Sequence, residues 1–420
     1  MKKTFLTYLF ALVALVAAAD TQQQIFDPSF KTLQVQLLDH PTAPPVMSLG
    51  SVDRIIVSFD QLAEDRSYLR YELIHCDAEW QPEGLVDSEF LDGFNIADVE
   101  DWAFSRVTLM HYVNYQITIP NEQMKPLISG NYLIRVFPED DPDNILLQAR
   151  FSIVEPLMSI VGDVTSRTDV ETNERLQQLE FEVDTHEYRV ENLFGGDLKV
   201  IVTQNGRHDN EIMVRNPLRV EGSKAIFEHQ RQLIFPGGNE YRRFEVSSTQ
   251  FPGMRVKHVL HADPLYHFEL WEDQPRFNQR YMYDQTQFGR FWIREYNSNE
   301  SAIDADYVMV HFTLEMPEMP DWDIYLDGDF TNRKFTDQYK MRYNPAESRY
   351  ESVQLLKQGS YNYLYLAQPK DKSKKINSLT ERIEGDFYNT VNEYVVKVYY
   401  RPPGTRYDRL LGVSVMYSGQ

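Results

Sequence analysis

Three adjacent residues, His75, Cys76 and Asp77, have side chains that could support catalysis or bind a metal. Cys76 is the only cysteine among 420 residues, and a cysteine beside a histidine suggests an activated thiolate. If residues 68–76 form a strand, however, successive side chains point to opposite faces, so His75 and Cys76 diverge. We therefore predict that Cys76 is a small buried residue at a strand end and that Trp80 belongs to the core.

Four aspartates, Asp321, Asp323, Asp327 and Asp329, lie close together in the stretch DWDIYLDGDF. An EF-hand loop needs acidic residues at alternate positions running into glycine, and bulky apolar residues interrupt that pattern here. A glycosidase needs two carboxylates that converge on one sugar, which this spacing does not establish. The Asp327-Gly328 pair is better explained as a turn that follows a strand.

The histidines are scattered, and only His258 and His261 have a close spacing, inside a segment that alternates like a strand. The sequence contains no H-E-x-x-H, C-x-x-C, G-x-S-x-G or phosphate-loop motif. The glycine pairs at 195–196 and 237–238 lack the strand-then-helix setting of a phosphate loop. We therefore predict that the protein is not an enzyme and has no catalytic, cofactor-binding or metal-binding residues.

The elements around these residues are predicted to be strands, because apolar and polar residues alternate along most of the chain. Ile55, Val57 and Phe59 fall on one face, and similar patterns recur up to the C-terminus. The stretch DLKVIVTQNGRHDNEIMV has the signature of a hairpin turning at Asn205-Gly206. Aromatic residues make up 13% of the chain, which also favours half-buried strands. The predicted fold class is all-β.

We predict three tandem β-sandwich domains of the Ig-like or early-set-like type, at 20–155, 157–300 and 301–420. The first boundary rests on Glu155-Pro156 after a strand, because proline interrupts the strand ladder. The second rests on the polar stretch 295–307, which has the composition of a linker.

The N-terminus indicates export. Lys2 and Lys3 precede an apolar stretch at 5–16, and Ala17-Ala18-Ala19 supplies a cleavage site, so residues 1–19 are predicted to be a Sec-type signal peptide. No later stretch is long and apolar enough for a membrane span. The net charge of −21 disfavours nucleic acid or anionic lipid as a partner, because both require a basic face.

Several motifs, taken in order, resemble one known family. They are YELIHCDAEWQP, EFLDGFN, HYVNYQITIPN, SGNYLIRVF, FPGGNEYRRFE, IEGDFYNTVNEYVVKVYYR and GTRYDRLLG. Together they resemble the plug protein of the bacterial type IX secretion system over nearly the whole exported chain. The resemblance implies a non-enzymatic periplasmic protein, peripherally associated with the outer membrane. It would bind the very large β-barrel translocon and close its periplasmic opening when cargo is absent. It carries over no catalytic or ligand residues, and the partner-binding residues stay unknown.

Two other classes of function remain open from the sequence. DWDIYLDGDFTN followed by YNYLYL resembles early-set sandwiches that bind glycogen or starch, which makes an exported carbohydrate-binding protein the main alternative. Such a protein would expose aromatic rings along a concave strip. A glycoside hydrolase would instead need two carboxylates in one cleft.

Overall fold

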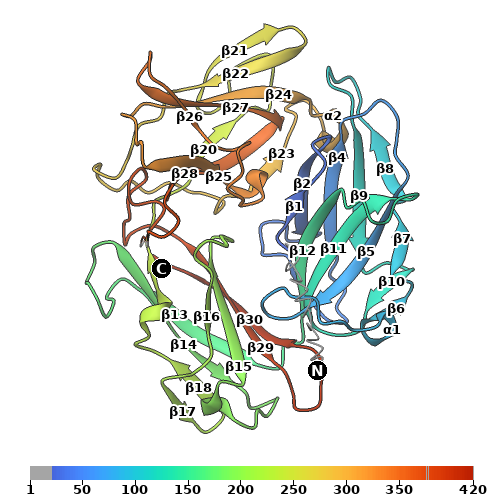
Figure 1. The fold of residues 1–420 in the computed structure, drawn as a ribbon, viewed down its shortest axis with the longest axis vertical. Helices are drawn as coiled ribbons and strands as arrows, with labels where there is room; N and C mark the ends of the chain where they lie inside the picture. The colour runs from blue at the N-terminus through green and yellow to red at the C-terminus, as the bar shows by residue number, and fades with distance from the viewer. Residues whose placement is uncertain (1–20, 375, 377, 420) are drawn as a thin grey trace, which may run out of the picture.

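The computed structural model describes residues 21–374, 376 and 378–419, so the predicted signal peptide at 1–19 lies outside the described residues. The described chain is built from β-sheets with only short helices, which confirms the all-β prediction. The larger sheets pack in pairs over three main hydrophobic cores. We call each pair a sandwich, and Figure 1 shows the three sandwiches arranged around a common centre.

The first sandwich contains residues from the N-terminal part of the chain. One sheet has the order β1-β12-β11-β5-β7 with β3 beside β12, the other has the order β2-β4-β9-β8, and β6 pairs with β10. The strands are β1 (Gln24–Ile25), β2 (Phe30–Leu37), β3 (Val46–Ser48), β4 (Ile55–Gln61), β5 (Leu69–Cys76), β6 (Leu91–Gly93), β7 (Ile96–Asp98), β8 (Asp101–Phe104), β9 (Val113–Ile119), β10 (Met124–Pro126), β11 (Gly130–Pro138) and β12 (Leu147–Val154), with helix α1 (Asp87–Phe90) before β6.

The second sandwich combines the middle of the chain with its end. Its sheets have the orders β13-β14-β18-β17, with β19 beside β14, and β16-β15-β29-β30. The strands are β13 (Ser159–Thr165), β14 (Leu176–Asp184), β15 (Leu198–Gln204), β16 (Ile212–Val214), β17 (Arg219–Glu221), β18 (Lys224–Phe227), β19 (Ile234–Pro236), β29 (Glu393–Tyr400) and β30 (Arg409–Tyr417), with short 3-10 helices at Leu193–Gly195 and Arg231–Leu233.

The third sandwich lies between the two parts of the second one in sequence. Its sheets have the orders β20-β28-β23, with β25 beside β28, and β21-β22-β24-β27-β26. The strands are β20 (Arg242–Glu245), β21 (Val256–Ala262), β22 (Leu265–Leu270), β23 (Phe291–Ile293), β24 (Tyr307–Leu314), β25 (Trp322–Asp327), β26 (Arg342–Asn344), β27 (Arg349–Lys357) and β28 (Gly359–Pro369), with helix α2 (Ser301–Asp304) and a 3-10 helix at Asp329–Thr331.

The sheets cross the predicted boundary between 157–300 and 301–420, so that linear division is wrong. The C-terminal strands β29 and β30 complete the second sandwich, where Val396 of β29 pairs with Val202 of β15. In the other direction, Phe244 of β20 pairs with Tyr361 of β28 in the third sandwich. In Figure 1 the red β29 and β30 lie beside the green β15. Alternation along one strand shows which face is buried but does not identify the pairing partner, so the sequence could not reveal this exchange.

The polar stretch 295–307 is also not a linker between domains. It lies within the third sandwich, between β23 and β24, and contains helix α2. Its polar residues contact the first sandwich: the side chain of Arg106 binds Asp304, and the backbone N–H of Arg106 donates to the carbonyl oxygen of Ile303. Polar composition therefore marks a surface between two sandwiches here.

Local sequence patterns explain the strands themselves. Ile55, Val57 and Phe59 of β4 are at most 1% exposed, as the alternation predicts. The predicted hairpin is confirmed by the antiparallel pairing of β15 with β16, which starts at Val202 and Ile212. Asn205 and Gly206 have φ values of 54° and 66°, the left-handed backbone expected for an Asn-Gly turn, although the full connection is longer than two residues.

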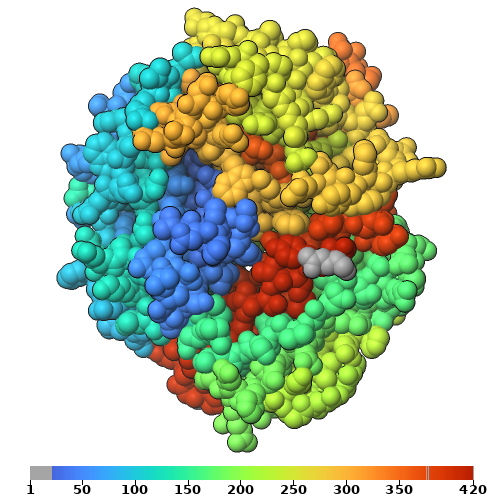
Figure 2. All heavy atoms as spheres, turned by 180° about the vertical axis from the view of Figure 1, so that it is seen from behind, coloured from blue at the N-terminus to red at the C-terminus, as the bar shows by residue number. Residues whose placement is uncertain are grey.

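The centre of the molecule is hollowed where the three sandwiches meet. Figure 2 shows the hollow from behind, bordered by blue N-terminal segments, orange segments of the third sandwich and red segments near the C-terminus. A cavity of about 190 Å³ lies there, and residues of all three sandwiches line it, among them Gln34, Asn205 and Arg333.

Candidate functional site

The stretch around Cys76 does not form a catalytic pair. Cys76 is fully buried at the end of β5 and packs against Trp80. His75 faces other partners: its Nδ1 lies 2.7 Å from Glu83 Oε2, and its Nε2 lies 3.1 Å from the Ser129 carbonyl oxygen. Burial raises the pKa of the Cys76 thiol to about 12, which keeps the thiol protonated at neutral pH. The predicted divergence of His75 and Cys76 and the burial of Trp80 are confirmed.

Three of the four aspartates of DWDIYLDGDF pair with cations. Asp327 is the last residue of β25 rather than part of the turn predicted to follow that strand, and its Oδ2 accepts a hydrogen bond of 2.7 Å from Arg333. Arg333 also binds Asp329 at 2.9 Å, while Asp323 pairs with Lys340 at 2.8 Å. The carbonyl oxygen of Asp321 accepts a hydrogen bond from the backbone N–H of Lys370, the residue after β28. These carboxylates stabilise the third sandwich.

The predicted histidine spacing leads to no cluster, but an unpredicted pair exists. His258 and His261 lie on the edge strand β21. His267 and His311 lie on the parallel neighbours β22 and β24, and their Nδ1 and Nε2 atoms are 2.8 Å apart. Within the described residues, no group of three or more His, Cys, Asp or Glu side chains is placed to hold a metal ion. The sequence could not reveal the pair because nothing in it shows that β22 and β24 are neighbours.

The polar groups that the structure does bring together lie at the junctions between sandwiches. At the junction of the first and third, Lys357 Nζ lies 2.6 Å from Asp60 Oδ2, and both side chains are at most 1% exposed. Asp60 also accepts hydrogen bonds from Tyr307 and Asn114, each at 2.7 Å. Lys357 Nζ lies 4.0 Å from the ring centroid of Tyr112, a cation–π contact. Burial lowers the pKa of Lys357, and the nearby Asp60 carboxylate opposes that change.

The same junction fixes the loop that follows β8. Arg106 binds Asp304 through two hydrogen bonds of 2.8 and 2.9 Å, and the backbone N–H of Leu109 donates to Asp306. Between these anchors, Val107 is fully exposed and has a φ of 57°. A β-branched residue rarely adopts this left-handed backbone, so the surrounding contacts must impose it. The loop thus presents an apolar side chain to solvent from a fixed position.

A buried carboxylate organises the junction of the first and second sandwiches. Asp408 is fully buried and accepts hydrogen bonds from Lys199 Nζ at 2.6 Å, Arg401 Nε at 2.8 Å and the Ala78 N–H at 3.0 Å. Burial pulls the pKa of Asp408 upward, but these donors outweigh it and hold the pKa below its usual value. An apolar cluster lies at the same junction and contains Ala78, Val154, Ile201, Tyr399 and Leu410.

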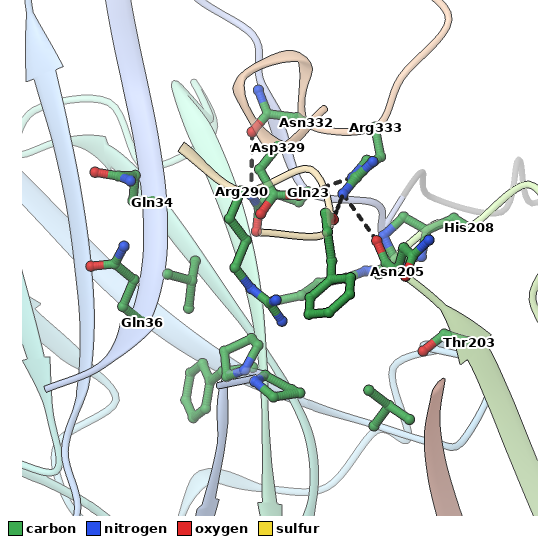
Figure 3. Close-up of a pocket in the computed structure, with 18 of the residues that line it drawn as sticks. Gln23, Gln34, Gln36, Thr203, Asn205, His208, Arg290, Asp329, Asn332 and Arg333 are labelled. Carbon is green, nitrogen blue, oxygen red and sulfur yellow. Dashed lines mark hydrogen bonds and ion pairs between the residues drawn. The ribbon is translucent and has the colours of Figure 1, made fainter. Parts of the chain in front are cut away.

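Arg333 and Arg290 connect the second and third sandwiches beside the central cavity. Arg333 is 5% exposed in its side chain and donates to the carbonyl oxygens of Asn205, at 2.9 Å, and Phe288, at 2.7 Å. Arg290 pairs with Glu393 of β29 at 2.6 Å. Figure 3 shows Arg333 close to Asn205 and, across the cavity, the side chains of β2. The three junctions together hold the sandwiches around one centre.

Similarity to known proteins identifies the chain. Residues 30–155 match the family model described as the type 9 secretion system plug protein 1st domain. Residues 30–155 belong to the type 9 secretion system plug family, as its first domain. The matched region is the first sandwich, which contains the stretch around Cys76. The resemblance found in the sequence motifs is thereby confirmed.

A solved structure extends the similarity beyond the matched plug domain. The crystal structure of a hypothetical protein from Parabacteroides merdae ATCC 43184 is 38% identical, with a TM-score of 0.91, over 94% of this chain and 99% of that chain. An alkylpurine DNA glycosylase AlkC from Pseudomonas fluorescens is 12% identical with a TM-score of 0.18, over 30% of each chain. A trypsin-activated alpha-2-macroglobulin from Escherichia coli is 10% identical with a TM-score of 0.17, over 93% of this chain and 24% of that chain. The TM-scores of these last two matches are too low to indicate a shared fold. No curated protein matches the chain.

Membership of the plug family indicates a role connected with type 9 secretion, in the setting of the periplasm and outer membrane. It is a structural rather than a catalytic kind of family. Among the residues that the structure describes, no helix has the length and apolar character needed to cross a membrane.

Proposed function

We propose that this protein is a non-enzymatic plug that binds the large outer-membrane β-barrel translocon of the type IX secretion system and closes its periplasmic opening when cargo is absent. The observation that carries the proposal is the family match over the first sandwich. The sequence motifs in the second and third sandwiches extend the resemblance along the chain.

The junctions between the sandwiches support this proposal physically. A body that obstructs a wide aqueous pore must keep its shape, and independent sandwiches on flexible linkers would not. Here buried ion pairs cross from one sandwich to another, such as Asp60 with Lys357 and Glu393 with Arg290. Separating the sandwiches would leave these charges without partners in a partly dry environment, which is costly. The three sandwiches therefore suit a single obstructing block.

Affinity purification of the tagged, exported protein from solubilised outer membranes tests the binding step. We expect a very large β-barrel protein to be recovered with it, and recovery should persist at high salt if binding depends on shape and apolar contact. Failure to recover any such barrel from cells that contain the secretion system would contradict the proposal.

Closure needs a separate measurement. In cells that lack the gene but keep the translocon, we expect the outer membrane to become more permeable to solutes that are too large for ordinary porins. Re-expression of the protein should restore the barrier. Unchanged permeability in cells with an empty translocon would refute pore closure even if binding had been observed.

The fixed loop after β8 supplies a matched pair of variants for the binding experiment. We propose that exposed Val107 contacts the translocon, because its strained backbone is imposed and its apolar side chain is unprotected. Val107→Asp should reduce recovery of the barrel. Val52→Asp is the control, since Val52 is 87% exposed on a different loop of the same sandwich. Equal recovery with both variants would exclude this loop from the contact.

The carbohydrate-binding alternative gains no specific support from the third sandwich. Tyr361, Tyr363 and Tyr365 of the YNYLYL stretch are at most 1% exposed, so their rings are not available to stack on a sugar. The Trp322 ring is covered by the guanidinium of Arg382, whose Cζ lies 4.1 Å from the ring centroid.

A further inference from the structure

The central cavity has features of a ligand site that pore closure does not require. Its lining includes β2 of the first sandwich, β15 and β29 of the second, and the segment around Arg290 of the third. Figure 3 shows Gln34 and Gln36 on one side, Thr203 and His208 on another, and Arg333 above them. Since ligand pockets commonly measure about 300–1,000 Å³, a volume of about 190 Å³ suits a molecule with one ring or a short chain.

One cation in this cavity, Lys397, lacks the carboxylate partner that Arg290 and Arg333 have. Arg290 pairs with Glu393, and Arg333 pairs with Asp327. Lys397 of β29 donates to the hydroxyl oxygen of Ser152 at 2.9 Å. Within the described residues it has no carboxylate within ion-pair distance. A partly buried ammonium without a counter-ion is unfavourable unless something else compensates its charge.

The wall beside Lys397 combines an aromatic ring with a second positive charge. Lys397 Nζ lies 5.8 Å from the centroid of the Trp80 ring, and Arg150 Cζ lies 4.3 Å from the same centroid. Both cations and Trp80 line the cavity. Burial lowers the pKa of Lys397 to about 8; Glu211, also in the lining, opposes this change, while Arg150 adds to it. Two cationic side chains thus flank the Trp80 ring beside this cavity, in a chain whose net charge is −21.

We propose that the central cavity binds a small organic carboxylate, with Lys397 as its main cationic contact, Arg150 as a second positive charge and Trp80 as the wall for its apolar part. A carboxylate supplies the single negative charge that Lys397 lacks, and ammonium–carboxylate hydrogen bonds are among the strong ones in proteins. Side-chain amides such as Gln34 and Gln36 add further polar groups to the lining.

The same chemistry could come from two sources, a free small acid or the C-terminal carboxylate of a peptide. Calorimetric titration of the exported protein can separate them. Phenylacetate and phenylacetamide form one pair of probes, and a tripeptide with a free or an amidated C-terminus forms the other. We expect the acid of at least one pair to bind and its amide not to bind. Phenylacetate binding would indicate a free acid, and binding of the tripeptide acid alone would indicate a chain terminus.

Two lysine variants test the assignment of Lys397. Lys397→Met should weaken binding of the acid about tenfold or more, the effect of losing one charge-assisted hydrogen bond. Lys125→Met is the control, because Lys125 is an exposed lysine on β10, outside the cavity lining. If neither acid binds, or if Lys397→Met binds as tightly as the unchanged protein, the proposal is wrong.

Chemical labelling of the unchanged protein avoids any effect of a variant on folding. Acetic anhydride acetylates lysine amines, and mass spectrometry can follow Lys397 and Lys125 in the same sample. The acid that binds in the titration should slow acetylation of Lys397 severalfold and leave Lys125 unaffected, while its amide should protect neither. Equal labelling of Lys397 with and without the acid would overturn the proposal.

Discussion

Two lysines that are removed from bulk water, Lys357 and Lys397, have different polar partners. Lys357 lies at the junction of the first and third sandwiches with Asp60 at 2.6 Å. Lys397 lies beside the central cavity, and its ammonium donates to the Ser152 hydroxyl. Burial lowers the pKa of both lysines, and only for Lys357 does a carboxylate in direct contact oppose the shift.

The contrast separates ion pairs that join two sandwiches from a cavity wall that can bind a further molecule. A paired buried lysine is part of a closed network, so removing either partner leaves an isolated charge. Lys397 has no carboxylate in direct contact, so we expect the fold not to depend on its charge.

Lys357→Met should be strongly destabilising. It leaves Asp60 buried without its counter-ion, and we expect the free energy of unfolding to fall by about 3–5 kcal/mol. Urea denaturation followed by tryptophan fluorescence measures the loss. The double variant Asp60→Asn, Lys357→Met should recover part of it, because the isolated charge is gone. A single variant as stable as the unchanged protein would show that the pair is not a structural contact.

Asp408→Asn tests whether a buried carboxylate that accepts hydrogen bonds from several donors stabilises the fold, as Asp60 is expected to do. We expect a loss of about 1–3 kcal/mol, because Lys199 and Arg401 lose their counter-charge. The pKa of Asp408 is lower in the folded than in the unfolded chain, so its contribution is present above about pH 4 and is lost as the pH falls further. The unchanged protein should therefore lose more stability than Asp408→Asn between pH 5 and the acid limit of folding. Equal losses of stability in the two proteins over this pH range would contradict this expectation.

Lys397→Met should leave stability near that of the unchanged protein or increase it, because an unpaired charge is replaced by an apolar chain of similar length. Because the pKa of Lys397 is about 8 when folded and about 10.4 when unfolded, the unfolded state binds more protons between these values. Stability of the unchanged protein should then rise with pH across that range. Lys397→Met should lack this rise, while Lys125→Met should keep it; denaturation midpoints from pH 7 to 10 give the comparison.

Cys76→Ser should have little effect on function, since it changes a buried side chain that carries no charge. We expect a loss of stability of about 1–2 kcal/mol, from placing a hydroxyl in the apolar setting of Trp80, and unchanged pore closure. The thiol of the folded protein should also react slowly with iodoacetamide, because its pKa is raised to about 12. A folded Cys76→Ser protein with severely impaired closure would show that the thiol does more than pack.

The strand pattern could be predicted because it is local. Ile55, Val57 and Phe59 alternate with polar residues, and each lies in the core of the first sandwich. The same alternation places His75 and Cys76 on opposite faces of β5. The division at residue 300 failed because the partner of a strand is not encoded in its own alternation: β29 pairs with β15, almost 200 residues earlier.

The all-β class, the buried faces of the strands, the strongly acidic charge and the motifs that mark the plug family could all be read from the sequence. Each of these depends on composition or on neighbours a few residues apart. Only the tertiary structure decided which charges meet, because those contacts join distant segments. Lys357 and Asp60 are 297 positions apart, and Lys397 and Ser152 are 245 apart. Nothing in either lysine's local sequence distinguishes the one that completes a junction from the one that faces the cavity.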